Sequence, residues 1–468
     1  MRVIFAAFSC WLVAVPHISV AASGQTAPAT FQTPPPGSVL TLERAIQVAL
    51  NTHPLIERAK SGKLLARSIT KQSKGERYPW LEASIAGSTG SLRIVSADGR
   101  TIHDQGAHGF DPGGALPKHN ENMLTGGLLL NQLISDFGYT AHRILADELN
   151  EEFSDKQLLT HKAQVILNVQ RAYLTTLLRQ RQVELAESTL RARKAFRDRM
   201  SSLYRNQLKS KVDVDLLQVE VSNAEFDLLG RTNDVKQEFA ALNNAMGLSV
   251  AHPYQLEQIE TVVSALPTVD TLLKKGLEAR PELRGARDKI QISAEVVKSM
   301  KALHFGSLSG VGILGVSRFF TVHDDGLHDN EVLPIWGVGA TVRFPLFSGF
   351  KVQNQISEAA HHQGEDEQDL QQTMNEVAVQ IIRGYLTQVS NGQQIPVEQE
   401  RVIISREALS LAQERYKNGL ASVVEVIQST ALLFQAESRL AELQYVYNLG
   451  DAALAYAIGE TSQRYEGQ

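Results

Sequence analysis

The chain has 468 residues, 43% of them hydrophobic, with 46 Lys and Arg against 51 Asp and Glu and a formal net charge of −5. This acidic balance argues against nucleic acid as a partner. No apolar stretch approaches the ~18–20 residues that a membrane-spanning helix needs, and the single cysteine, Cys10, lies in the leader, so the rest has no disulfide, thiol nucleophile or thiolate metal ligand.

The first residues have the pattern of a secretory signal peptide. Arg2 supplies a positive start, an apolar run extends from Val3 to Val15, and small residues near Ala22 offer a cleavage site. A lipoprotein would be modified at Cys10, but the residues before it fit that signal badly and more apolar residues follow it. We therefore expect a signal peptide at residues 1–22.

The rest of the chain is predicted to contain two similar halves. Each half has a helix, two strands joined by a polar loop, a very long helix and a return helix. A proline-rich extended tether is predicted at 23–39, a linker at 248–268 and a short tail at 460–468. The first repeat, at 40–247, has a helix at about 42–74, strands at about 81–95 and 123–133, and a long helix from Asp136 to Leu208. The second repeat, at 269–459, has a helix at 269–303 and strands at about 307–320 and 333–346. Helical runs this long favour coiled-coil packing.

Three stretches of the second half match stretches of the first half in the same order. A constant shift aligns Tyr204/Tyr416, Asn206/Asn418, Ser210/Ser422, Val214/Val426, Ala224/Ala436, Glu225/Glu437 and Gly247/Gly459 without a gap. The stretch "ALNTHPLIERAK" from Ala49 resembles "GLEARPELRGAR" from Gly276, and "NQLISDFG" from Asn131 resembles "FPLFSGF" from Phe344. Three ordered matches indicate duplication of a unit far longer than a solenoid repeat.

The last predicted strand alternates between two kinds of residue, as a strand with two different faces does. The apolar set comprises Trp336, Val338, Ala340, Val342 and Phe344. The other set consists mainly of small or polar residues. In an outer-membrane strand the apolar face meets lipid, with aromatic residues near the interfaces, so we expect the apolar set to face lipid. A half-buried strand of a soluble sandwich would show the same alternation.

Four strands per chain are too few to close a barrel, and lipid does not tolerate an open sheet edge. Three chains would supply twelve strands, so a membrane location requires a cyclic trimer. The expected fold class is mainly α with a β-barrel contribution. Two other classes stay open: a periplasmic or surface coiled-coil adhesin without a channel, and a hydrolase or metal-dependent enzyme that uses loop histidines.

The duplicated layout, the motif "RYKNGLASVVEV" at Arg415–Val426 and the Ala/Leu-rich helix that follows it resemble the TolC family of outer-membrane efflux and secretion channels. The resemblance extends from about Leu40 to Gly459, and "NQLISDFG" is similar to the variant in members that serve type I secretion. It implies a homotrimeric α/β tunnel in which a twelve-stranded barrel in outer-membrane lipid, shared by three chains, continues into a periplasmic helical tunnel.

The resemblance also implies partners: a periplasmic adaptor and an inner-membrane ABC or proton-driven pump. The chain would then be the exit duct of a tripartite efflux or type I secretion system. The adaptor would dock at the two helix reversals, formed by Asn206, Gln207, Leu208 and Ser210 in the first half and Asn418, Gly419, Leu420 and Ser422 in the second. Since Gln207 stands where the second half has glycine, we expect the first turn to differ in detail.

In the family, acids just beyond each turn line a narrow periplasmic entrance, which carries over to Asp213 and Glu425. We expect Tyr416 and Gln428 to belong to the same constriction. The family's second acid falls on Gln428 and its basic partner on Ala421, so we expect a weaker closed state. A three-fold ring of Glu425 would favour cations. The alternative role of such an acid is a favourable interaction with the dipole at a helix start.

Two other patterns carry no function in this interpretation. "GVGILG" at Gly310–Gly315 matches a dinucleotide fingerprint, but it lies within a predicted strand and follows a helix, without the strand–loop–helix context. The polar loops contain His103, Asp104, His108, Asp111, His323, Asp324, Asp325 and His328 without a fixed ligand spacing, so we expect solvated loops rather than a metal site. No cofactor and no catalytic constellation are expected.

Overall fold

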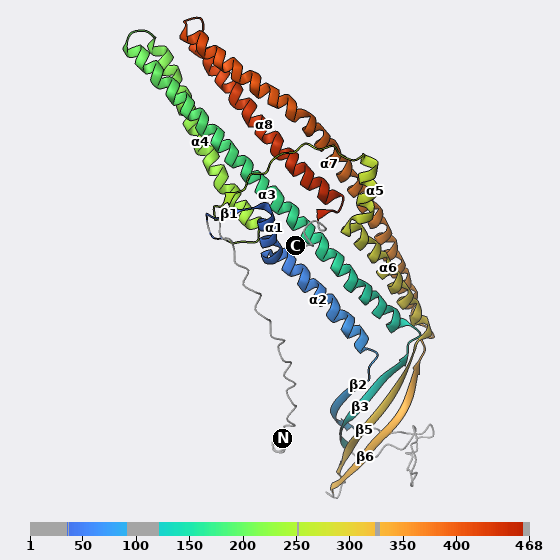
Figure 1. Ribbon diagram of the computed structural model, residues 1–468. Helices are drawn as coiled ribbons and strands as arrows, with labels where there is room; N and C mark the ends of the chain where they lie inside the picture. Colours follow the sequence, from blue (N-terminus) through green and yellow to red (C-terminus); the bar gives the residue numbers. More distant parts are fainter. Residues whose placement is uncertain (1–34, 36, 91–120, 250–251, 323–327, 462–468) are drawn as a thin grey trace.

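The computed structural model describes residues 35, 37–90, 121–249, 252–322 and 328–461. Figure 1 shows a long molecule with a β-sheet at one end and the tips of two helical hairpins at the other. The predicted signal peptide, nearly all of the tether and of the tail, and the first polar loop with its histidines lie outside the described residues.

The helices form two equivalent sets. In chain order they are α1 Leu42–Thr52, α2 Pro54–Gly75, α3 Tyr139–Arg205 and α4 Lys211–Ala245 in the first half, and α5 Val269–Ala279, α6 Pro281–Ala302, the 3₁₀ turn η1 Leu303–Phe305, α7 Lys351–Lys417 and α8 Val423–Ala457 in the second. Equivalent α-helices have equal lengths of 11, 22, 67 and 35 residues. The two halves therefore repeat the same helical elements residue for residue.

The first helix of each half is broken, which corrects the prediction of single helices at 42–74 and 269–303. The breaks fall at His53 and Arg280, whose backbones are extended, and Pro54 and Pro281 begin the next helices. Proline disfavours helical backbone in the residue before it and lacks the amide proton that a continuous helix would use. At the first position of a helix that proton has no partner in any case, so proline fits there.

The sheet has the order β2-β3-β5-β6, and all its described neighbours are antiparallel. Its strands are β2 Trp80–Gly90, β3 Glu121–Ser135, β5 Ser307–Val322 and β6 His328–Arg343. The last strand was predicted at about 333–346, but β6 begins earlier, inside the stretch that was expected to be a loop. It ends before Phe344, which corrects the assignment of Phe344 to the strand. Pro345 follows Phe344 and disfavours continued pairing because it has no amide proton.

The register gives this sheet one mainly apolar face, which also carries Gln132 and Arg318. Directly opposed residues of antiparallel strands point to the same side, so the row Ala83–Leu128–Leu314–Trp336 shares a face. The exposed large hydrophobic residues on this face are Leu81, Ile85, Leu124, Leu128, Leu130, Leu314, Val316, Val332, Trp336, Val338 and Val342. The opposite face is mixed, with Glu82, Ser84, Thr125, Asn131, Ser317, Thr341 and Arg343 among its residues. Val338 is 90% exposed, so none of the described residues covers this part of the face.

The helices continue the order of the strands. Helix α2 contacts α3, α3 contacts α6, and α6 contacts α7, as β2, β3, β5 and β6 do. Further from the sheet, α3 pairs with α4 and α7 with α8, and the two hairpins meet through α3 and α8. Between these levels, β1 Val39–Leu40 pairs in parallel with β4 Gln255–Leu256. The buried Tyr173 hydroxyl donates to the Leu40 carbonyl at 2.8 Å, which fixes this small sheet to α3.

One buried position differs between the hairpins and leads to a stability prediction. Gln388 of α7 is 1% exposed, and both its amide atoms lack a hydrogen-bond partner among the described residues. Its equivalent Thr176 donates to the Ala172 carbonyl at 2.7 Å. An unpaired buried polar group costs about 1–3 kcal/mol, so Gln388→Met should raise the thermal unfolding midpoint of the detergent-solubilised protein.

The matched control is Thr176→Val, which should lower the same midpoint because its hydroxyl is satisfied. If Gln388→Met lowered the thermal unfolding midpoint by more than Thr176→Val does, the Gln388 amide would be paired in the folded protein.

Candidate functional site

Both hairpin tips use the same helix-ending motif. In the first, the Gln207 N–H bonds to the Tyr204 carbonyl at 2.8 Å and the Leu208 N–H to the Leu203 carbonyl at 2.9 Å. In the second, Gly419 and Leu420 make the corresponding bonds to Tyr416 and Arg415 at 3.1 and 2.8 Å. These pairs define a Schellman motif with its left-handed residue at Gln207 (φ 63°) and Gly419 (φ 76°). The first turn therefore does not differ in its helix-ending bonds, but it differs at the following cap: the Ser210 hydroxyl accepts from the Asp213 N–H at 3.3 Å, whereas Ser422 makes no side-chain cap bond.

Tyr416 of α7 is buried between the two hairpins. It is 4% exposed, its ring lies edge-on to that of Phe196 with centroids 5.8 Å apart, and Lys209 Nζ lies 4.2 Å from its ring centroid. Its hydroxyl lies 3.1 Å from Met200 Sδ and donates to Asp213 Oδ2 at 3.4 Å. Tyr416 therefore joins the second hairpin to the acid of the first.

Burial raises the pKa of Tyr416 to about 12, and the charge and hydrogen bond of Asp213 act in the same direction. The hydroxyl consequently stays protonated and remains a donor to Asp213 throughout the neutral range. Around it pack Met200, Leu217, Ala412, Val423 and Val426, with Phe196, Leu203, Val214, Leu409, Ala421 and Ile427 at the edge. The hairpin tips thus share one small core, and Ala421 belongs to its edge.

Glu425 does not contact Asp213 in any described interaction; it has its own partner. Arg415 Nη1 lies 2.9 Å from Glu425 Oε1, and Arg415 Nη2 donates to the Leu420 carbonyl at 3.3 Å. Gln428, one turn further along α8, is exposed. The structure therefore brings Tyr416 and Asp213 together and keeps Glu425 and Gln428 on the separate surface of the second hairpin.

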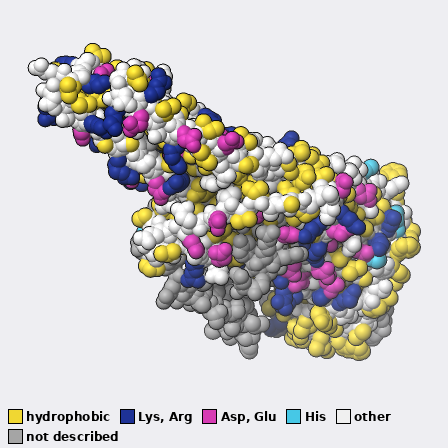
Figure 2. Space-filling model, turned by 45° about the horizontal axis from the view of Figure 1, so that its top comes forward, with side chains coloured by type: hydrophobic (Ala, Val, Ile, Leu, Met, Phe, Trp, Pro, Cys, Tyr) yellow, Lys and Arg dark blue, Asp and Glu magenta, His cyan; other side chains and the backbone are white. Residues whose placement is uncertain are grey.

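At the other end of the molecule, exposed aromatic residues surround the junction between sheet and helices. They are Tyr78, Trp80, Phe137, Phe305, Phe344, Phe347 and Phe350. The rings of Phe347 and Phe350 lie 5.6 Å apart, and those of Phe137 and Phe305 6.1 Å apart. Figure 2 shows hydrophobic side chains gathered at the end of the molecule opposite the tips, whereas charges of both signs mix along the helices. Aromatic rings at such a boundary are typical of a membrane interface.

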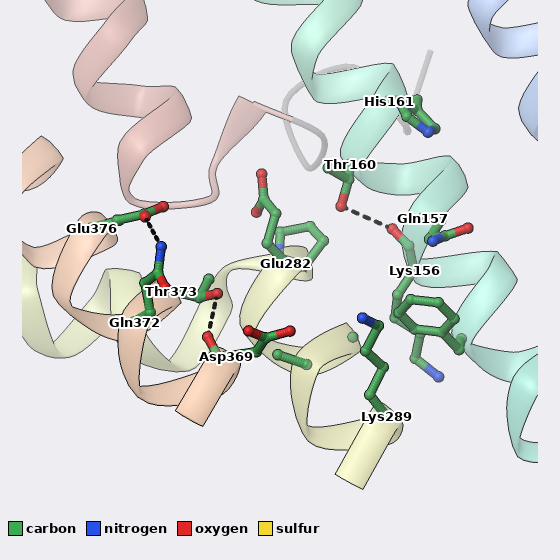
Figure 3. Close-up of a pocket in the computed structure, with 14 residues that line it drawn as sticks. Lys156, Gln157, Thr160, His161, Glu282, Lys289, Asp369, Gln372, Thr373 and Glu376 are labelled. Atoms are coloured by element: carbon green, nitrogen blue, oxygen red, sulfur yellow. Dashed lines mark hydrogen bonds between the residues drawn. The ribbon is translucent and has the colours of Figure 1, made fainter. Parts of the chain in front are cut away.

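A groove on the helical wall has mixed charge. It has a volume of 520 Å³ and is bordered by α3, α6 and α7 (Figure 3). Lys156 pairs with Asp288 at 3.5 Å, and Glu282 accepts from Arg280 and from the Tyr456 hydroxyl at 3.1 and 3.0 Å. Lys156 and Glu282 are thus held in structural pairs, and the residues that line the groove do not form a nucleophile–base arrangement.

The glycine-rich pattern has a structural explanation, whereas the loop histidines and aspartates, except His328 at the start of β6, lie outside the described residues. "GVGILG" lies within β5, and a Cβ at Gly315 would lie 2.5 Å from the Gly126 carbonyl oxygen, so this glycine is needed for close packing of strands. Among the described residues, no cluster of three or more His, Cys, Asp or Glu could hold a metal ion. No described helix is long and apolar enough to cross a membrane.

The sequence matches the family described as "Outer membrane efflux protein" over residues 45–248 and 272–460, which together are most of the chain. The chain belongs to the outer membrane efflux protein family. This membership confirms the predicted family, the outer-membrane location and the role of an efflux duct, and it decides against an adhesin.

Members of the outer membrane efflux family with curated descriptions are distant in sequence. "Cation efflux system protein CusC" of Escherichia coli O6:H1 is 22% identical over 84% of this chain and 80% of its own length. "Solvent efflux pump outer membrane protein SrpC" of Pseudomonas putida is 22% identical over 66% and 67%. "Outer membrane protein TolC" of Salmonella enteritidis is 22% identical over 42% of this chain, and the chain spans only 40% of that protein.

Solved structures of similar proteins confirm the fold class. A structure of CusC has a TM-score of 0.74 at 17% identity and covers 92% of this chain and 95% of its own. The channel OprN has a TM-score of 0.75 at 16% identity, with 90% of each chain covered. VceC of Vibrio cholerae has a TM-score of 0.71 at 18% identity, covering 89% and 96%. These likenesses extend over both halves of the repeat.

Two functional residues at the hairpin tips of this efflux protein were not predicted from the sequence. Arg415 supplies the basic partner that was sought at Ala421, and Lys209 covers the Tyr416 ring. A signal for Arg415 was present: it lies in the last turn of one helix, and Glu425 lies in the first turn of the next. Across a short reversal these two turns are neighbours, so an opposite-charge pair there was predictable. Lys209 had no such signal, because its contact crosses between hairpins.

Proposed function

We propose that three copies of this chain form one continuous duct, with the apolar sheet face in outer-membrane lipid and the hairpin tips in the periplasm. The observation that carries this proposal is the combination of an uncovered apolar face with two edge strands, β2 and β6, each paired on one side only among the described residues. Unpaired strand edges cannot remain open in lipid. Joining β6 of one copy to β2 of the next gives twelve strands and removes every edge.

The exposed aromatic residues at the sheet–helix junction set the position of this duct in the membrane. The rings at the sheet–helix junction would lie at the periplasmic interface, so the sheet crosses the lipid and the helices begin outside it. Helices α3 and α7, with 67 residues each, extend about 100 Å at ~1.5 Å per residue. That length carries the hairpin tips far into the periplasm, where an adaptor would dock at the residues of the two turns.

The duct would receive its cargo from an adaptor and an inner-membrane pump. Relatives of this chain bear names that specify cations, solvent and toluene. Such different cargoes on one fold indicate that the pump selects the cargo and the duct conducts it. Asp213 and Glu425, which follow the two turns, would lie at the periplasmic entrance of the duct.

The test is reconstitution of the mature protein into planar lipid bilayers after membrane fractionation. The protein should sediment with outer membranes, resist extraction with urea and give discrete conductance steps. Release by urea together with an absence of conductance in correctly folded protein would contradict the duct.

A further inference from the structure

The second hairpin tip carries a side-chain bracket across its turn. The Arg415 guanidinium reaches Glu425 Oε1 at 2.9 Å with one nitrogen and the Leu420 carbonyl at 3.3 Å with another. It therefore holds the last turn of α7, the turn itself and the first turn of α8 together. A guanidinium suits this task because its planar fork presents several donors in fixed directions, whereas a lysine ammonium presents a single charged point.

We propose that Arg415 determines the ion selectivity of the duct entrance by neutralising Glu425 within each chain. This inference rests on the proposed trimeric duct. Three copies would then bring together three Arg–Glu pairs rather than three uncompensated carboxylates. An uncompensated acid ring favours cations and excludes anions, whereas a ring of ion pairs has no net charge and imposes little preference of its own.

The first hairpin shows that this bracket is a specific feature of the second. The residue equivalent to Arg415 is Leu203, which packs at the edge of the shared core. The acid equivalent to Glu425 is Asp213, which is held by Tyr416 of the other hairpin. One tip acid therefore couples the two hairpins, and the other is neutralised inside its own turn.

Other charges near the second tip do not replace Arg415. Lys417 lies 3.6 Å from Glu414, on its own helix, and Lys209 stands over the Tyr416 ring. Arg415 and Glu425 side chains are 48% and 37% exposed, so their pair contributes little to stability. Its effect is on the field met by ions within about 8–10 Å, the range over which salt leaves such charges unscreened.

The test is a double-mutant cycle read as the cation-to-anion permeability ratio in planar bilayers. Arg415→Gln should raise the ratio several-fold by exposing the acid ring, and Glu425→Gln should lower it by exposing the guanidinium ring. The double variant should return to the wild-type ratio. Arg415→Lys keeps the positive charge, so its permeability ratio should stay near that of the wild type. This variant distinguishes an effect of the lost charge from an effect of the substitution on folding.

A matched control is Arg406→Gln, which breaks another α7–α8 ion pair, with Glu437 at 2.8 Å, away from the tip. It should leave selectivity unchanged. The inference is overturned if Glu425→Gln alone abolishes a cation preference while Arg415→Gln has no effect in conducting trimers. A wild-type protein that forms no channel would instead overturn the proposed duct, and this inference with it.

Discussion

Ala340→Arg should prevent the chain from assembling in the outer membrane, whereas Thr341→Arg, one residue further along the same strand, should be tolerated. Ala340 shares the apolar face of the sheet with Val338 and Val342, and it is paired with Gly310 of β5. An arginine that faces lipid at the bilayer midplane costs about 2–4 kcal/mol in each chain. A trimer would incur this cost three times, once in each chain, which makes it one of the largest effects expected of any single substitution.

The control uses the same residue type on the other face. Thr341 lies opposite Ser309 on the mixed face, which would line the water-filled interior of the duct. The measurement is the amount of heat-resistant trimer in outer-membrane fractions for both variants. Equal amounts would show that the apolar face does not meet lipid, and a loss only for Thr341→Arg would mean that the two faces are assigned the wrong way round.

Tyr416→Ala should open the periplasmic end of the duct and raise its basal conductance. The side chain is buried in the core shared by the two hairpin tips, and it is the only described link to Asp213 from the second hairpin. Truncating a buried aromatic residue to alanine costs about 3–5 kcal/mol. Because both hairpins remain folded through their own helix pairs, we expect this loss to weaken the contact between them rather than to unfold the chain.

Tyr416→Phe separates the packing of the ring from the hydrogen bond. It keeps the contact with Phe196 and loses the hydroxyl's bonds to Met200 Sδ and to Asp213, and a hydrogen bond to a charged group is worth about 1.5–3 kcal/mol. Its basal conductance should therefore lie between those of the wild type and Tyr416→Ala. The measurement is the conductance of single trimers in planar bilayers at low voltage. Unchanged conductance in Tyr416→Ala trimers would show that this core does not hold the entrance closed.

Much of the architecture could be predicted from the sequence because periodicity reports on exposure. The alternation from Trp336 to Val342 predicted a two-faced strand, and the register now shows that the apolar face extends over all four strands of the sheet. The duplication was visible because matched residues such as Tyr204 and Tyr416 keep a constant separation. Equal helix lengths in the two halves explain why this alignment needed no gap.

Other features depend on contacts that local sequence does not encode. Gln207 adopts the left-handed conformation of its glycine counterpart because the Schellman bonds fix the turn, so the turn is set by the helices on both sides. The extra residues at the start of β6 pair with β5 although they read as a polar loop, because the partner strand is long enough to pair with them. Tyr416 matched a family motif, but its insertion between hairpins was not visible in the chain.

The two tips are therefore alike in backbone and different in chemistry. Both end in the same turn, yet the acid of the first hairpin is held by the second hairpin, and the acid of the second is held by its own Arg415. In a duct that opens at its tips, contacts between hairpins would control the opening, and contacts within a hairpin would keep its tip intact. The expected roles of Asp213 and Glu425 differ for this reason.

Pairing between β6 of one copy and β2 of the next can be tested directly by cross-linking. The only cysteine, Cys10, lies in the predicted signal peptide, so the mature protein offers a cysteine-free background. The measurement places one cysteine at Ala83 on β2 and a second, in turn, at Val338, Ala340 or Val342 on β6, and follows cross-linking in outer membranes by denaturing electrophoresis. At least one pair should yield a covalent closed trimer. Failure of every pair to cross-link, in protein that keeps its full strand content as a monomer, would contradict it.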